Sequence, residues 1–204
     1  MARALFSICD GARPMIVEKT PRHALFLDRI HSAFPRSKVI GLVRDGRDVL
    51  SSLRAFGQDW SKRMGEVSNG AEHWLRYNRA MIERSAELQE PTLLIRYEDL
   101  LQDFHGALTS VFEFLELDHA PDVVSSIVDR NTFQAYTGRD PGDERRGQFN
   151  RKGVAGSFLN DLSSSEIEAY ESLAAPMLER FGYALCGPAL PAEGATPQDE
   201  PAPA

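Results

Sequence analysis

The sequence predicts an α/β fold in which a parallel sheet is flanked by helices. Short apolar runs rich in β-branched residues alternate with longer segments of helical periodicity, and this alternation is typical of parallel sheets. The chain has 204 residues, of which 42% are hydrophobic and 26% charged, so it is long enough to bury a core. We expect one domain over residues 1–186, followed at 187–204 by a Pro- and Ala-rich tail of disordered composition.

Three apolar runs are predicted to be strands: residues 15–17, 38–43 and 92–95. The run KVIGLV at 38–43 is the clearest, because it is continuous, rich in β-branched residues and bounded by polar ones. In a parallel sheet, ligands bind beyond the carboxyl ends of the strands. The residues that follow these runs are therefore the first candidates for a functional site.

The remaining patterned segments are predicted to be helices. Pro21 suits a first helical turn, and that helix should end before Pro35. A capping box from Ser163 to Glu166 should open the last helix, which Pro176 should kink. The predicted helices cover residues 21–34, 48–56, 70–88 and 100–115, and a final helix opens at 163.

The first candidate site follows the 15–17 run. Lys19 lies just past a predicted strand, and Pro21 opens the next helix. A cation in that position can meet an anion, with support from the dipole of the helix N-terminus. The structural alternative is a surface Lys that pairs with a neighbouring acid.

The second candidate site is RDGRDVLSS at residues 44–52. Arg44 stands where the clearest strand ends, Gly46 permits a tight turn, and Ser52 lies on the following helix. A guanidinium fork with a hydroxyl suits a phosphate. The structural alternative is an Arg47–Asp48 surface pair and a capping Asp.

The third candidate site is NRKGVAG at residues 150–156. Arg151 and Lys152 are adjacent cations beside Gly153, and such a loop can wrap an anion with its backbone N–H groups. A flexible basic surface loop is the structural alternative.

Taken in order, EKTP, RDGRDVLSS, RYEDL and RKGVAG resemble the motifs of sulfotransferases that use 3′-phosphoadenosine 5′-phosphosulfate (PAPS). The resemblance covers about residues 5–184. It implies a P-loop-NTPase-like sulfotransferase fold, with PAPS as co-substrate and no metal.

The resemblance also implies a role for each matching residue. Arg44 and Ser52 match the Arg and Ser that hold the 3′-phosphate of the nucleotide, and Arg151, Lys152 and Gly153 match the loop that closes on it.

Further matches concern the adenine and the transferred group. Tyr97 of RYEDL matches a Tyr that approaches the adenine, and Thr132 and Phe133 resemble the pair that lines the adenine site. Lys19 matches a Lys beside the transferred sulfuryl group. His23 is a candidate base, with a helix-surface His as its alternative.

The chain departs from the family pattern near its start. Members carry a glycine-containing PRSGTT-type loop that cradles the 5′-phosphosulfate, and residues 1–14 contain nothing like it. Pro21 stands where some members carry a catalytic His, and Gly156-Ser157-Phe158-Leu159 stands where the pattern reads GDWK. We therefore expect an N-terminally truncated domain that transfers sulfate very slowly or not at all on its own.

Two explanations of the absent loop stay open. Either a truncated sulfotransferase needs a strand, loop and helix supplied from elsewhere, or the chain is an inactive nucleotide-binding or interaction module. A nucleotide kinase-like phosphotransferase is a remote third possibility, because no GxxxxGK[ST] loop is present.

Composition narrows the partners and the location. The net charge of −7 argues against nucleic acid, and no run approaches the roughly 18 apolar residues of a membrane span. Cys9 and Cys186 form no CxxC pair, so neither a disulfide framework nor a zinc site is expected. We expect a cytoplasmic protein whose acceptor is a small molecule, a glycan or a peptide. Residues 59–69 and 136–149 are the candidate acceptor loops.

Overall fold

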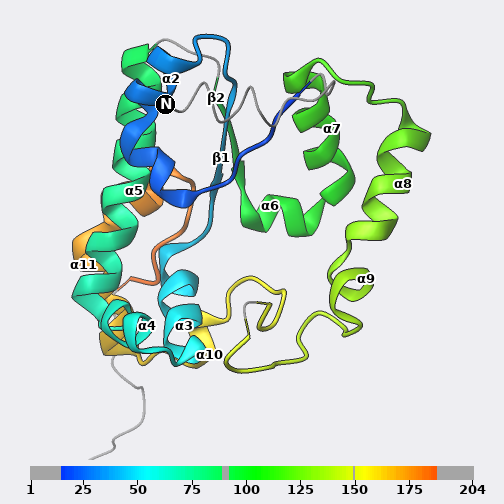
Figure 1. Ribbon diagram of the computed structural model, residues 1–204. Coiled ribbons are helices and arrows are strands. Elements are labelled where there is room, and N and C mark those ends of the chain that lie inside the picture. The colour runs from blue at the N-terminus through cyan, green and yellow to red at the C-terminus, as the bar shows by residue number, and fades with distance from the viewer. Residues whose placement is uncertain (1–14, 89–91, 149, 188–204) are drawn as a thin grey trace, which may run out of the picture.

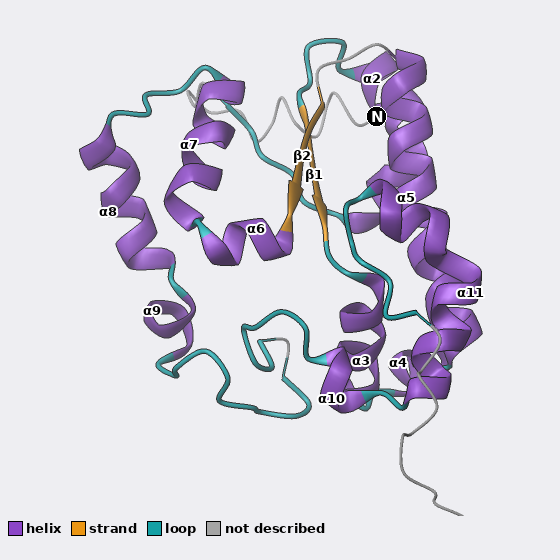
Figure 2. Ribbon diagram, turned by 180° about the vertical axis from the view of Figure 1, so that it is seen from behind, coloured by secondary structure: helices purple, strands orange, loops and turns teal. Residues whose placement is uncertain are grey.

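A computed structural model describes residues 15–88, 92–148 and 150–187 (Figure 1). Two strands, β1 (Val39–Val43) and β2 (Thr92–Arg96), pair in parallel between groups of helices (Figure 2). The predicted α/β class with a parallel sheet is confirmed. Cys9 and the expected tail beyond residue 187 lie outside the described residues, and the domain limit at 186 stays a prediction.

Helices account for most of the described residues. Five precede β2: η1 (Pro21–Phe26), α2 (Leu27–Ala33), α3 (Gly46–Phe56), α4 (Asp59–Met64) and α5 (Val67–Leu88). Six follow it: α6 (Tyr97–Gln102), α7 (Phe104–Leu115), α8 (Pro121–Asn131), α9 (Phe133–Thr137), α10 (Phe158–Asp161) and α11 (Ser164–Arg180).

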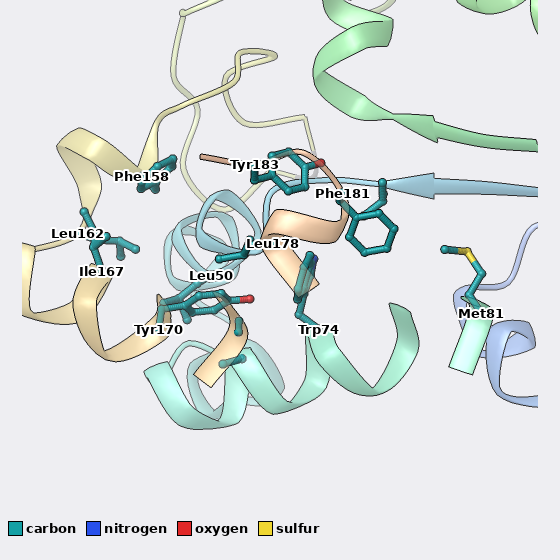
Figure 3. Packing of buried hydrophobic residues seen from close by; sticks show 13 residues of the cluster. Leu50, Trp74, Met81, Phe158, Leu162, Ile167, Tyr170, Leu178, Phe181 and Tyr183 are labelled. Carbon is teal, nitrogen blue, oxygen red and sulfur yellow. The ribbon is translucent and has the colours of Figure 1, made fainter. Parts of the chain in front are cut away.

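The core lies between β1 and the helices α3, α5, α10 and α11 (Figure 3). Trp74 of α5 meets Phe181 edge-on, with 5.9 Å between ring centroids. Leu50, Tyr170 and Leu178 are almost fully buried beside them. Trp74 and Met81 of α5 are both buried in this core, which fixes α3 beneath the end of β1.

The register of the sheet places the candidate site. Val43 pairs with Arg96 at the carboxyl ends of the two strands. Arg44 directly follows β1 and Tyr97 directly follows β2, so both residues lie at the same edge of the sheet.

Residues 15–17 do not form the predicted strand. They belong to no helix or strand and are exposed, with Val17 at 81% exposure. A short apolar run becomes a strand only when a neighbouring strand takes up its backbone hydrogen bonds, and within the described ranges β1 pairs with β2 alone.

The 21–34 helix begins as a 3₁₀ turn, η1, and continues as α2. Its buried residue is Leu27, whereas Leu25 and Ile30 are half-buried and Phe26 is exposed. A 3₁₀ turn holds three residues rather than 3.6, so it rotates the apolar face.

The long helix predicted over 100–115 is divided into α6 and α7. Asp103 ends the first and caps the second, because its carboxylate accepts a hydrogen bond from the backbone N–H of Gly106. At α11 the predicted capping box of Ser163 and Glu166 is confirmed. The helix continues through Pro176.

Candidate nucleotide site at the carboxyl edge of the sheet

Arg44 and Tyr97 are in direct contact at the sheet edge. The guanidinium carbon of Arg44 lies 4.7 Å from the centroid of the Tyr97 ring. Arg44 also donates to the carbonyl of Val154 at 3.2 Å and lies 3.4 Å from the carboxylate of Asp48. Burial raises the pKa of Tyr97, and the charge of Arg44 opposes that rise. The phenol therefore stays neutral and offers an aromatic face beside a cation.

The cations of the closing loop, residues 150–156, gather around carboxylates. Arg151 is buried and donates to the hydroxyl of Ser51 and to Asp161, both at 2.8 Å, and to Glu144 at 3.0 Å. Lys152 donates to Asp161 at 3.1 Å. This closing loop is therefore anchored, and the alternative of a free basic surface loop is wrong.

Ser51, and not its neighbour Ser52, contacts the closing loop. Adjacent residues of a helix project about 100° apart, so one of the two serines faces Arg151 while Ser52 is only half-buried. The role assigned to Ser52 stays a prediction. The pair of adjacent serines was the signal that could have pointed to Ser51.

Asp48 joins the closing loop to α3. Its fully buried carboxylate accepts hydrogen bonds from the backbone N–H groups of Gly156 at 2.8 Å and Phe158 at 2.9 Å. The structural alternative of an Arg47–Asp48 surface pair is wrong, because both residues are buried and bind other partners. Asp48 thus sets where the closing loop lies.

Gly153 is required by a close approach. Its φ is +64°, and an added Cβ would lie 2.4 Å from the Phe133 ring. Phe133 also has Arg139 over its ring at 5.2 Å, and Thr132 caps α9 by accepting from the N–H of Ala135. The structure thus places Phe133 against the closing loop.

Lys19 and His23 lie outside this cluster of contacts. Lys19 is exposed, and His23 pairs with Glu18 at 2.6 Å between Nδ1 and the carboxylate. Across residues 15–88, 92–148 and 150–187, no hydrogen bond or ion pair links either residue to Arg44 or to the closing loop. Their catalytic roles stay predictions.

Buried hydrogen bonds hold the turn that carries Arg44. Trp74 donates its indole N–H to the carbonyl of Arg44 at 2.9 Å, and Glu98 accepts from the backbone N–H of Asp45 at 3.0 Å. The other oxygen of Glu98 accepts from Tyr183 at 2.7 Å. Burial and then Glu98 raise the pKa of Tyr183.

Arg47 forms a second, buried ionic cluster beside the site. It donates to Asp45 through two nitrogens, to Glu171, and to the carbonyl of Ala184 at 2.9 Å. Burial works against the charged form, but the two carboxylates outweigh it and raise the pKa of Arg47. Asp45 also caps α3, as expected of an Asp in this turn.

An open hollow adjoins the closing loop. Its volume is about 360 Å³, and six polar or aromatic residues line it: Tyr136, Thr137, Arg139, Arg145, Gln148 and Asn150. These residues fall within, or next to, the predicted acceptor loop at 136–149. The other predicted loop, 59–69, is largely helix α4 and the start of α5.

The described chain contains no group of three or more His, Cys, Asp or Glu side chains placed to hold a metal ion. Within it, no helix combines the length and apolarity of a membrane span.

Comparison with known proteins agrees with these features. The model of the sulfotransferase family matches residues 1–121 of the 204. Sulfotransferase 2B1 of Mus musculus is 28% identical over 194 residues, which cover 82% of this chain and 55% of that protein. Sulfotransferase 6B1 of Danio rerio is 24% identical over 152 residues, covering 68% of this chain and 51% of that protein.

A solved structure shares the fold. The mouse sulfotransferase SULT7A1, crystallised with PAP, superposes with a TM-score of 0.57 at 17% identity, over 73% of this chain and 60% of that chain. The chain spans about half the length of the curated relatives named above. The parallel α/β architecture and the family match together define the class: the chain belongs to the sulfotransferase family.

Proposed function

We propose that this chain forms the nucleotide-binding part of a sulfotransferase that takes the sulfuryl group from PAPS. One observation carries the proposal: three segments distant in sequence meet at the carboxyl edge of the sheet. Arg44 stacks on Tyr97 and donates to the carbonyl of Val154, and Arg151 donates to the hydroxyl of Ser51 on α3. Guanidinium groups and a hydroxyl that are held in place by the surrounding structure can donate several hydrogen bonds to a doubly charged phosphate ester.

In this proposal the 3′-phosphate binds to the anion site, defined as Arg44, Ser51, Arg151 and Lys152, with Ser52 as the neighbouring hydroxyl. The adenine lies against aromatic faces, for which Tyr97 and Phe133 are the candidates, with Thr132 at the start of α9. Gly153 lets the closing loop approach closely.

The proposed reaction is an in-line attack of an acceptor hydroxyl or amine on the sulfur of PAPS. A new oxygen–sulfur or nitrogen–sulfur bond forms while the bond from sulfur to the 5′-phosphate oxygen breaks. A base takes the acceptor proton, and a cation neutralises the leaving bisphosphate. His23 oriented by Glu18 is the candidate base, and Lys19 the candidate cation.

A second function has its own support. An inactive nucleotide-binding module would need the anion site but neither Lys19 nor His23. The separation of these two residues from the contacts of the anion site favours that alternative. Labelled PAPS and a panel of acceptors distinguish the two, because only the enzyme releases sulfated product.

The hollow beside the closing loop is the proposed binding place of the sulfuryl acceptor. The hollow beside the closing loop has guanidinium, amide and phenol groups on its walls, which suits a polar or anionic acceptor such as a small molecule, a glycan or a peptide. We place this activity in the cytoplasm as part of the same proposal.

Calorimetric titration tests the anion site. The chain should bind adenosine 3′,5′-bisphosphate at least tenfold more tightly than adenosine 5′-monophosphate, because only the former carries the 3′-phosphate. Arg44→Ala should remove most of that preference. Arg84→Ala is the matched control, since Arg84 pairs with Asp28 between α5 and α2. Equal affinity of the wild-type chain for both nucleotides would refute the proposal.

A further inference from the structure

The carboxylate of Asp161 is surrounded by hydrogen-bond donors from three side chains. Ser51 donates to it at 2.5 Å and Arg151 at 2.8 Å, and Lys152 contacts both of its oxygens at 3.1 and 3.3 Å. This is as full a set of partners as a carboxylate commonly receives. Asp161 is thus the anion that the anion site holds in this structure.

These donors are three of the four groups that the proposed function assigns to the 3′-phosphate; the fourth is Arg44, which lies 3.4 Å from Asp48. One N–H group makes one strong hydrogen bond, and a carboxylate and a phosphate at the same donors repel each other. We propose that Asp161 competes with the 3′-phosphate of the nucleotide for Ser51, Arg151 and Lys152, and so sets the affinity of the site. The inference rests on the proposed function and adds a residue that the sequence motifs do not contain.

Unlike the two cations, Asp161 stands on a helix. It ends α10, whose first N–H is held by Asp48, and α10 packs on α3 (Figure 1). Arg151 and Lys152 instead project from the closing loop on long side chains. Binding therefore requires the two cations to turn from Asp161 towards the phosphate while α10 stays in place.

Glu144 is a second, weaker competitor. It lies 3.0 Å from Arg151 and 3.8 Å from Lys152, and it shares its carboxylate with Arg146 at 3.3 Å. It contacts fewer donors of the anion site than Asp161 does. Removing its charge should therefore have the smaller effect.

The charge of Asp161 persists at neutral pH. Partial burial alone would raise its pKa, but hydrogen bonds from Ser51, Arg151 and Lys152 outweigh this and lower the pKa to about 2. The carboxylate is therefore fully ionised at the neutral pH at which nucleotide binding is measured.

Removal of this charge tests the inference. Asp161→Asn keeps the shape of the side chain, and it should bind adenosine 3′,5′-bisphosphate about three- to tenfold more tightly than wild type, the range of a few charge-assisted contacts. Its affinity for adenosine 5′-monophosphate should not change. Asp28→Asn is the control, because it removes an equal charge from an ion pair in α2, at the opposite end of the molecule from α10 (Figure 1).

Each other result is decisive. Weaker or unchanged binding of the bisphosphate by Asp161→Asn, or an equal gain for both nucleotides, means that the carboxylate does not compete with the 3′-phosphate, and the inference fails while the proposed function stands. If neither wild type nor variant prefers the bisphosphate, the proposed function fails and the inference with it. Should Asp161→Asn unfold, Glu144→Gln provides the test, with an expected gain below threefold for the bisphosphate and none for the monophosphate.

Discussion

At the scale of single residues, the anion site is electrically balanced by its own carboxylates. Arg151 is buried, which requires partners, because an unpaired buried charge costs several kcal/mol. Asp161 and Glu144 supply them. The sequence motifs contain the cations but not these acids. The motif RKGVAG does not indicate that Asp161, ten residues after Arg151, will be its partner.

Asp161 should make the stability of the chain depend on acid pH. Its pKa falls from an ordinary 3.8 to about 2 on folding, so its stabilising effect is complete above pH 4 and is lost as the pH falls towards 2. Asp161→Asn should lower the free energy of unfolding by about 1 kcal/mol at neutral pH, allowing for solvent screening. Urea denaturation between pH 7 and pH 2 measures the difference, and a gap that persists at pH 2 would contradict it.

At the scale of elements, one carboxylate connects the closing loop to a helix. Asp48 lies in the first turn of α3 and binds two backbone N–H groups beyond the RKG sequence. Because α3 is packed into the core, these two hydrogen bonds also hold the closing loop in a fixed position. The stacking of Arg44 on Tyr97 is likewise set by secondary structure, because the register of β1 and β2 places the residues that follow the two strands side by side.

Asp48→Asn should loosen the closing loop. The amide offers one acceptor oxygen where two N–H groups need one each, so one buried N–H loses its partner at a cost of about 1–3 kcal/mol. Trypsin should then cleave at the exposed Arg145 and Arg146 several times faster than in wild type. Asp129→Asn, on the exposed face of α8, is the control. Unchanged cleavage would show that other contacts hold the closing loop.

Local patterns predicted the elements well and their partners poorly. The runs at 38–43 and 92–95 formed β1 and β2, and the capping box opened α11, because these features depend on adjacent residues. The run at 15–17 did not form a strand, since strand formation also needs a partner that local sequence does not name. The sequence motifs named Arg44, Tyr97 and Arg151, whose binding of a nucleotide stays a prediction. They did not name Ser51, Asp48 or Asp161, because the contacts of these three with the closing loop or with α3 span about 100 residues.

At the scale of the whole molecule, the sheet that β1 and β2 form has apolar surface that the other described residues leave exposed. Ile40 and Leu42 point to the same face of β1, and they are 40% and 59% exposed. Parallel sheets are usually covered on both faces. Such a surface favours association between copies at high concentration.

Leu42→Thr should reduce that association without harming the fold. Threonine keeps a β-branched side chain suited to a strand but removes apolar surface, so the free energy of unfolding should change by about 0.5 kcal/mol or less. Light scattering over a concentration series measures the association. Leu50→Ala is the contrasting variant, because it empties a buried position and should cost about 2–5 kcal/mol. Identical scattering curves for Leu42→Thr and wild type would contradict the prediction.

The ionic cluster of Arg47 also bears on the order in which the protein is completed during synthesis. Its partners Glu171 and Ala184 stand 124 and 137 positions further along the chain. A ribosome releases the turn that carries Arg44 long before it releases them. A nascent chain halted before α11 therefore already contains all the residues of the proposed anion site, but it lacks the partners that hold Arg47 in the turn after β1.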